Sequence, residues 1–322
     1  MSRPGQAPRL LIALSGVTAL VAVTPLVYLL IRVLDAGPEK IASSLLRSRT
    51  LTTTVTSIEL VVVVVAACLI IGVPVAWLLA RARLPLKGLW IVLAALPLAM
   101  PSYVAAYAWI AEFPAMSGFW AAALILALVS MPYVIIPTTA ALRGIDPAME
   151  EVARSLGRKP WSAFWFAAMP QAWPAAAAGS LLVGLYVLSD FGAVALFRVD
   201  AFTRVIYTSY RASFDRTSAA VLAVVLVLLA AILIYAERRV RGRTARWRTG
   251  SGSARRTTEV DLTSRQRVMA VLALTGLAIL GLGVPAFSLL RRLSEGTRRP
   301  LDLAELATAT HLPEVTRLDL RL

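Results

Sequence analysis

The sequence predicts an all-α protein that crosses a membrane several times. Hydrophobic residues make up 58% of its 322 positions, charged residues only 16%, and the mean hydropathy is +0.74. Seven apolar runs recur along the chain, each near the length of roughly 20 residues that a helix needs to cross a bilayer. This composition excludes an ordinary soluble domain and favours an integral membrane protein.

The seven predicted helices account for most of the chain. The first is expected to stay uncleaved, because its apolar stretch is longer than that of a signal peptide and no clear small-residue cleavage site follows it. The expected boundaries are 10–31, 55–80, 88–111, 119–141, 174–196, 219–236 and 268–290. Between the sixth and seventh helices, the polar segment 237–267 contains Gly, Ser and many arginines and is typical of a flexible linker.

The distribution of basic residues predicts the orientation, since positively charged loops resist translocation. With the N-terminus inside, nineteen Lys and Arg residues fall in the inner loops and seven in the outer loops, and the linker supplies ten of the nineteen. We therefore expect a multi-pass plasma membrane protein with a cytoplasmic N-terminus and a cytoplasmic linker.

Several function classes are disfavoured by what the chain lacks. Its net charge of +15 is explained by inner loops that attract anionic lipid headgroups, so the bilayer is the expected partner and nucleic acid is not. One cysteine, Cys68, and one histidine, His311, provide no Cys/His metal site. The sequence has no GxxxxGK[ST] loop and no Ser/His/Asp set, so we expect no catalytic residue, no cofactor and no enzyme activity in this chain.

The loop between the fourth and fifth helices, 142–172, has the sequence signals of a short helix. Asp146 and Pro147 fit an N-cap and a first-turn proline, and Glu150 and Glu151 follow in the first turn, where the helix dipole favours anions. Gly157 fits the residue that ends the helix. A short charged helix beside the aromatic run WSAFWF indicates a docking element for a cytoplasmic partner. The alternative is an amphipathic helix that lies on the bilayer.

This loop resembles the EAA loop of ABC importer permeases. The family pattern, E-A-A, three residues, G, nine residues, I-x-L-P, is matched at Glu151, Ala153, Gly157 and Pro170 and differs at Val152, Ala167 and Met169. The resemblance implies a six-helix type I ABC importer permease bundle, with a seventh helix after the linker. It also implies that the loop is a coupling helix, with contacts to the ATPase from Glu150, Glu151, Ala153, Gly157 and Pro170.

The same resemblance implies three partners. A cytoplasmic ABC ATPase dimer would bind and hydrolyse ATP, an extracytoplasmic substrate-binding protein would deliver the cargo, and a second permease half would complete the membrane part. A membrane scaffold without an ATPase is the alternative from a different class.

A second stretch, LSDFGAVALFRVDAFTRVIYTSY at 188–210, is similar to the region after the coupling loop in ferric iron importer permeases. The (A/S)DFG part appears at 189–192 and a TFT-like part at 201–203, and the likeness spans roughly Leu45 to Ala236. It implies ferric iron as the cargo and a bacterial plasma (inner) membrane as the location. Thiamine, a polyamine or an inorganic anion are alternative cargoes.

Polar side chains near or within the apolar runs are candidates for a translocation path. Asp190 is costly inside a span, so it is expected to line a wet cavity or to hydrogen-bond a neighbouring backbone. Prolines 97, 101, 132 and 137 are expected to break the third and fourth helices. The other path candidates are Tyr103, Tyr107, Ser130 and Tyr133, and helix packing is the alternative role for each.

The length of the chain predicts three regions. Residues 1–236 correspond to one six-helix permease half, 237–267 to the linker, and 268–322 to the first helix and an external segment of an incomplete second half. Ferric iron permeases of this type are usually fused duplicates, and no second EAA-like segment occurs in this sequence. We therefore expect a truncated or split chain, or a half-size permease with an extra tail.

Overall fold

The computed structural model describes residues 9–145, 148–211, 215–244 and 259–298. Apart from one isolated bridge, the secondary structure of these residues is entirely helical, as predicted. Six helices are long and apolar enough to cross a membrane, and a bent pair of helices provides a seventh candidate span. The seven apolar runs of the sequence each correspond to one of these spans.

In chain order, the helices of the described residues are α1 (Arg9–Asp35), α2 (Pro38–Leu45), α3 (Ser48–Arg81), α4 (Lys87–Ala95), η1 (Leu96–Ala99), α5 (Ser102–Glu112), α6 (Gly118–Ser130), α7 (Pro132–Arg143), α8 (Ala148–Ser155), α9 (Pro160–Ala163), η2 (Phe164–Ala168), α10 (Met169–Ser189), α11 (Gly192–Leu196), α12 (Phe202–Arg211), α13 (Arg216–Thr244), α14 (Ser264–Ala278), η4 (Ile279–Gly283) and α15 (Val284–Arg298).

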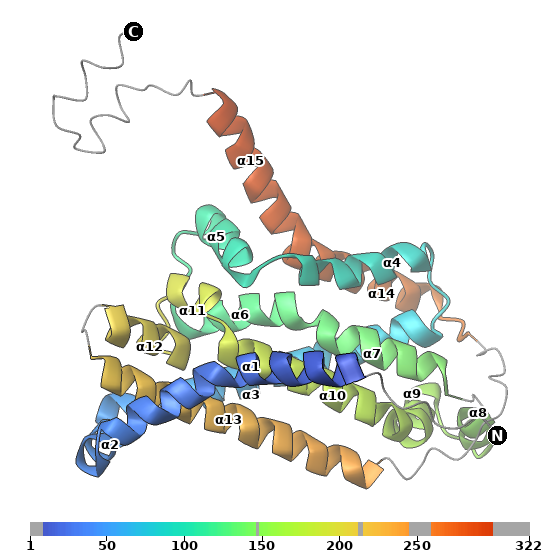
Figure 1. Ribbon diagram of the computed structural model, residues 1–322. Coiled ribbons are helices and arrows are strands. Elements are labelled where there is room, and N and C mark those ends of the chain that lie inside the picture. The colour runs from blue at the N-terminus through green and yellow to red at the C-terminus, as the bar shows by residue number, and fades with distance from the viewer. Residues whose placement is uncertain (1–8, 146–147, 212–214, 245–258, 299–322) are drawn as a thin grey trace.

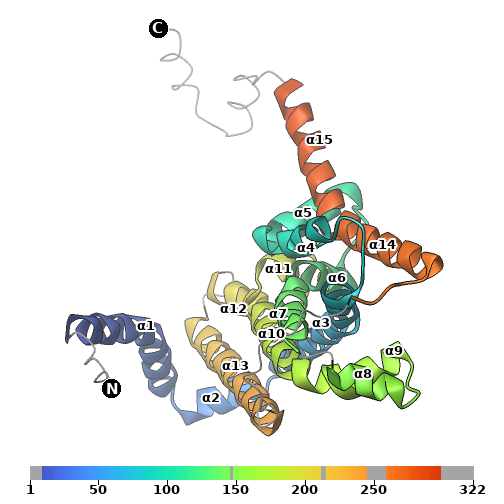
Figure 2. The ribbon, with the colours of Figure 1, turned by 90° about the vertical axis from the view of Figure 1, so that its right-hand side faces the viewer.

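The long helices run side by side and leave short elements at the two ends of the bundle. Figure 1 shows α8 and α9 at the right-hand end, near the beginnings of α4 and α14, and α2, α11 and α12 toward the opposite end. Figure 2 shows α1 standing to one side of the bundle and α15 projecting above it. The loop that the sequence singles out therefore lies at one end of the helices.

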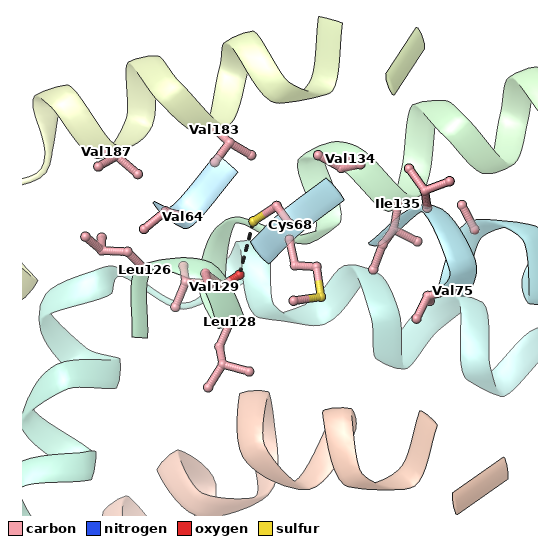
Figure 3. Packing of buried hydrophobic residues seen from close by; sticks show 14 of the residues in the cluster. Val64, Cys68, Val75, Leu126, Leu128, Val129, Val134, Ile135, Val183 and Val187 are labelled. Atoms are coloured by element: carbon pink, nitrogen blue, oxygen red, sulfur yellow. Dashed lines mark hydrogen bonds between the residues drawn. The ribbon is translucent and has the colours of Figure 1, made fainter. Parts of the chain in front are cut away.

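The core lies where α3, α6, α7 and α10 meet. Val64 and Cys68 of α3 pack against Leu126 of α6 and Val183 of α10 (Figure 3), and all four are at most 1% exposed. Small residues bring the backbones close together, as is common between helices in membranes. At Gly179 of α10, a Cβ atom would lie only 2.3 Å from the carbonyl oxygen of Tyr133 of α7.

The third predicted helix, 88–111, is not one straight span. The structure breaks it into α4 with η1 and then α5, and the two parts bend by 97°. Pro97 lies in the 3-10 turn η1, Met100 is extended, and Pro101 precedes α5. The predicted break at these prolines is confirmed. At Pro132 the helix is interrupted only at Met131, whose backbone stays in the right-handed helical region, so α6 and α7 still form the single span Gly118–Arg143. The predicted break at Pro137 was wrong, because Pro137 lies inside α7.

The fifth predicted helix has different limits from those expected. The span begins at Trp161 and ends at Ser189, so it does not reach residue 196. A π-helical turn, η2, lies near its beginning, and Asp190 separates α10 from the short helix α11. The polar residue that the sequence places inside a helix thus lies between two helices.

The predicted flexible linker, 237–267, is ordered at both edges. Helix α13 continues to Thr244, and α14 begins at Ser264, where Thr263 and Gln266 form a capping box. Val260 forms a bridge with Ala82 in the α3–α4 connection. The two edges of the expected linker therefore have regular structure, while 245–258 lies outside the described residues.

Candidate functional site

Helix α8 forms where the sequence predicts it, within the 142–172 loop. Glu150 and Glu151 lie in its first turn, where their carboxylates interact favourably with the positive end of the helix dipole. The expected N-cap at Asp146 and Pro147 lies outside the described residues. The helix is therefore supported by its acidic first turn and by the way it ends.

Gly157 ends α8 with a Schellman motif, as predicted. The N–H of Gly157 donates to the carbonyl of Arg154 at 2.9 Å, and the N–H of Arg158 donates to the carbonyl of Ala153 at 3.1 Å. Gly157 has a φ of +87°, which residues with a Cβ rarely adopt, although there is open space for a Cβ atom. The glycine is thus required by the backbone conformation and not by crowding.

The two glutamates of α8 have different environments. Successive residues of an α-helix point about 100° apart, so neighbours face different surroundings. The side chain of Glu151 is exposed to solvent. The side chain of Glu150 is only 14% exposed, and its Oε1 lies 3.0 Å from Nη2 of Arg81 at the end of α3. Glu150 therefore faces the bundle and Glu151 faces away from it.

The other residues predicted to contact the ATPase also differ in how far they are exposed to solvent. Gly157 and Pro170 are exposed and Ala153 is half-buried. Two apolar side chains accompany Glu151 on the outer surface: Val152 is 59% exposed and Leu156 is 80% exposed. Helix α8 therefore presents a small surface that combines a carboxylate with aliphatic groups.

The aromatic run after Gly157 is partly an internal packing element. The rings of Trp161 and Phe164 pack against Trp77 of α3, with centroids 5.7 and 6.2 Å away, and Phe164 is fully buried. The guanidinium of Arg158 lies 3.7 Å from the centroid of the exposed ring of Phe166. The aromatic residues thus fasten the loop to α3, while α8 itself carries no aromatic residue.

Asp190 lies between α10 and α11 and caps the start of α11. It is 7% exposed, and its Oδ1 accepts from the backbone N–H groups of Ala193 and Val194, at 2.9 and 3.4 Å, at the start of α11. Its Oδ2 accepts from the hydroxyl of Ser102 at the start of α5. Both carboxylate oxygens are thus satisfied by protein donors, which fits the predicted role of bonding a neighbouring backbone.

The DFG-like stretch brings α11 against α5. A Cβ atom at Gly192 would lie 2.7 Å from the Cβ of Tyr103 and 3.0 Å from the hydroxyl oxygen of Ser102. The hydroxyl of Thr203 in α12 donates to the carbonyl of Asp190. Aspartate caps the helix, glycine permits the close approach, and threonine secures the turn from a third element.

The remaining path candidates are not gathered in one place. Tyr133 packs its ring against Tyr186, 5.9 Å between centroids, and the phenol of Tyr186 interacts with Ser102 and Asp190. Ser130 is fully buried, where its hydroxyl donates to the carbonyl of Leu126. The structure therefore packs Tyr133 against Tyr186 of α10 and places Ser130 within the helix packing.

The two tyrosines of α5 are exposed, and one of them contacts the seventh span. Arg292 of α15 donates to the hydroxyl of Tyr107 at 3.2 Å, and the neighbouring Arg291 pairs with Glu112 at 3.2 Å. Tyr103 is exposed beside Gly192.

Among the described residues, no group of three or more His, Cys, Asp or Glu side chains is placed to hold a metal ion.

Sequence reasoning missed Arg81, Ser102, Tyr186 and Thr203. Arg81 ends an apolar run, where a basic residue also indicates topology, and nothing local distinguishes an exposed from a buried arginine. Ser102 and Thr203 are small polar residues in helices, so only their distance from Asp190 reveals their role.

Comparison with known proteins assigns the family. Residues 72–245 match the family model described as "Binding-protein-dependent transport system inner membrane component". The chain belongs to this family. The matched region includes α8 and the 188–210 stretch, and it ends within the segment expected to be a linker.

Curated relatives of this chain include permease proteins of transport systems named for different cargoes. The chain is 31% identical over 273 residues to the Fe(3+)-transport system permease protein FbpB 2 of Haemophilus influenzae, covering 85% of this chain and 54% of that protein. It is 27% identical over 198 residues to the sulfate transport system permease protein CysT of Escherichia coli, covering 55% and 71%. It is 32% identical over 145 residues to the molybdenum transport system permease protein ModB of Mycobacterium bovis, covering 40% and 55%. The chain thus spans about half the length of its FbpB relative.

The fold of this chain is also found among solved structures. A chain of the MetNI methionine ABC transporter, in an inward-facing conformation, superposes with a TM-score of 0.53 at 17% sequence identity. The match covers 62% of this chain and 97% of the MetNI chain. This likeness confirms the predicted type I ABC importer permease fold.

Proposed function

We propose that this chain is a membrane-spanning permease subunit of an ATP-driven importer and that α8 is its docking element for a cytoplasmic ATPase. The observation that carries the proposal is the geometry of α8. Glu150 attaches the helix to the bundle through Arg81, while Glu151, Val152 and Leu156 remain exposed at the end of the helices. Such an element is fixed on one side and available to a partner on the other.

The basic residues around α8 support a cytoplasmic location for this end. Arg83, Arg143, Arg158 and Lys159 are exposed near α8 or the α3–α4 connection. Positively charged segments are retained on the cytoplasmic side, so the α8 loop would be cytoplasmic. Four candidate spans precede this loop, and an even number of spans returns the chain to the same side, so the N-terminus would also be cytoplasmic. We place the protein in a bacterial plasma membrane, where an extracytoplasmic binding protein would deliver cargo at the opposite end.

We propose ferric iron as the cargo. Support comes from the FbpB relative, which is matched over most of this chain, and from the capped DFG-like turn at Asp190. Relatives with sulfate and molybdenum in their names keep an inorganic anion as the second candidate. Uptake of radioactive iron, molybdate and sulfate by vesicles that contain the permease, its ATPase and its binding protein would decide between them.

Hydrolysis of ATP belongs to the proposed ATPase dimer, and this chain is proposed to hold no cofactor. A second permease half, in the same polypeptide or another one, would complete the membrane part. The fraction of the FbpB relative that the chain covers, 54%, supports this requirement.

Copurification of the ATPase from membranes tests the docking role of α8. The variants are Glu151→Lys, which reverses an exposed charge, and Gly157→Asp, which adds a negative charge at the C-terminal end of α8. Glu39→Lys makes the same charge reversal in α2, toward the opposite end of the bundle, and is the matched control. We expect both α8 variants to lose the ATPase and the control to retain it. Retention by all three would refute the docking role of α8, and failure of the unmodified chain to copurify any ATPase would revive the membrane scaffold.

A further inference from the structure

A positively charged side chain is buried where α8 meets the bundle. Arg81 is 2% exposed and is the largest of the fully buried side chains among the described residues. Its Nη2 lies 3.0 Å from Oε1 of Glu150 and donates to the carbonyl of Ile145 at 3.3 Å. A buried guanidinium persists only with such partners, because taking a charge out of water is costly.

The two contacts of Arg81 hold the α8 loop at two successive points. Ile145 lies in the connection that leads out of α7, and Glu150 lies in the first turn of α8. Nearby, Nη2 of Arg143 donates to the carbonyl of Leu79 at 3.1 Å, which ties the end of α7 to the last turn of α3. The end of α3 is therefore the support against which the α8 loop is held.

The backbone of Arg81 also reaches a third part of the chain. The N–H of Val260 donates to the carbonyl of Arg81 at 2.7 Å, and the N–H of Arg83 donates to the carbonyl of Val260 at 3.1 Å. Ion pairs strengthen this contact, with Lys87 lying 2.8 Å from Glu259 and Arg83 lying 2.9 Å from Asp261. Residue 81 thus joins α3, the α8 loop and the segment that leads into α14.

We propose that Arg81 is a positioning residue that transmits displacement of α8 to α3 and to the segment before α14. This inference rests on the proposed function, in which α8 is the element that the ATPase moves. Arg81 holds α8 through its ion pair with Glu150, and it holds the start of the loop through its hydrogen bond to Ile145. Because of these two contacts, α8 and the end of α3 move together. Without these contacts, α8 would still present Glu151 and Gly157 to the ATPase, but its movement would be absorbed within the loop.

The decisive variant is the double substitution Arg81→Met with Glu150→Gln. It removes both charges and leaves similar side-chain volumes, so no charge stays buried alone. The matched control is Arg204→Met with Asp200→Asn, which removes an ion pair outside the α8 loop whose two side chains are 28% and 53% exposed. Arg81→Lys is a second test, because Nη2 alone reaches both acceptors and the ammonium keeps the charge on a shorter side chain.

The first measurement needs no partner protein. A nitroxide label is attached at Val152→Cys on the exposed side of α8, and the native Cys68 is buried, so labelling is selective. We expect the double variant at positions 81 and 150 to raise the rotational mobility of the label about twofold, an intermediate rise for Arg81→Lys, and no change in the control. Equal mobility in the parent and the double variant would overturn the proposal.

The second measurement separates anchoring from docking. In membranes that contain the ATPase, the double variant is expected to retain the ATPase and to transport about tenfold less cargo per ATP hydrolysed. Normal coupling in that variant, or an equal loss in the control, would also overturn the role of Arg81. If the unmodified chain binds no ATPase but the label still responds, the proposed function fails while the anchoring of α8 by Arg81 stands.

Discussion

The two ends of the bundle each place an acidic side chain beside a helix terminus, and the two side chains are stabilised in different ways. Glu150 at the α8 end meets a full positive charge on Arg81. Asp190 at the other end meets the hydroxyl of Ser102 and the backbone N–H groups of Ala193 and Val194. An acidic residue in an apolar context is therefore not by itself a sign of a transport path, because its partners decide its role.

This difference also determines how far a disturbance would spread. The Glu150 pair connects α8 to α3, so its loss affects two elements and leaves a buried cation behind. Asp190 mainly closes a turn between α10 and α11 and contacts α5 through one hydroxyl. We expect larger effects at the α8 end, and the following predictions are ordered from the largest to the smallest.

Glu150→Ala should produce the largest loss of stability. It leaves the guanidinium of Arg81 buried without a carboxylate, which costs about 3–5 kcal/mol. Glu151→Ala is the matched control and should stay within about 0.5 kcal/mol, because its side chain is exposed. Thermal unfolding of the detergent-purified protein measures both. Similar unfolding temperatures for the two variants would contradict the division of roles between the glutamates.

Asp190→Ala should cost less, about 1–3 kcal/mol, because it leaves buried backbone donors without an acceptor. Asp190→Asn keeps one side-chain oxygen that can accept from Ala193 and should lose less. Unfolding measurements on the two variants test the cap. If Asp190→Asn is as stable as the parent chain but transports no cargo, the side chain has a role in translocation beyond capping.

Gly157→Ala should destabilise the end of α8 by about 1–2 kcal/mol, since an L-residue must then adopt the left-handed conformation. Gly157→Asn should cost less, because asparagine tolerates this conformation. Hydrogen exchange of the Arg158 amide, which donates to the carbonyl of Ala153, reports the change locally. Equal protection in the alanine and asparagine variants would show that the backbone conformation is not the constraint.

The smallest effect concerns the pH dependence of the contact before α14. The hydrogen bond from Lys87 lowers the pKa of Glu259 below its usual value. Because the carboxylate is favoured in the folded state, its stabilisation is present at neutral pH and is lost as the pH falls through the lowered pKa. Glu259 is partly exposed, so solvent screening keeps the pair under about 1 kcal/mol.

The variant Glu259→Gln measures this contribution. Its difference in unfolding free energy from the parent chain should be present at neutral pH, shrink in high salt, and vanish at acidic pH. A difference that grows as the pH falls would contradict the stabilising ion pair with Lys87.

Local signals in the sequence were sufficient for the elements that depend on few neighbours. The apolar runs predict the spans, because a helix must satisfy its own backbone in lipid. The acidic first turn and Gly157 predict α8 and its end, because both effects act within a few residues along the chain. The bend before α5 was also indicated, since Pro97 and Pro101 interrupt the helical hydrogen bonds.

The sequence alone thus determined that this protein is an all-α membrane protein with a glycine-ended helix in the loop between its fourth and fifth predicted helices. Only the tertiary structure decided that Glu150 faces inward and Glu151 outward, that Asp190 ends α10, and that Arg81 is buried. The physical reason is that burial and electrostatic partners come from segments distant along the chain. Ile145 and Glu150 are more than 60 residues from Arg81, and Ser102 is 88 residues from Asp190.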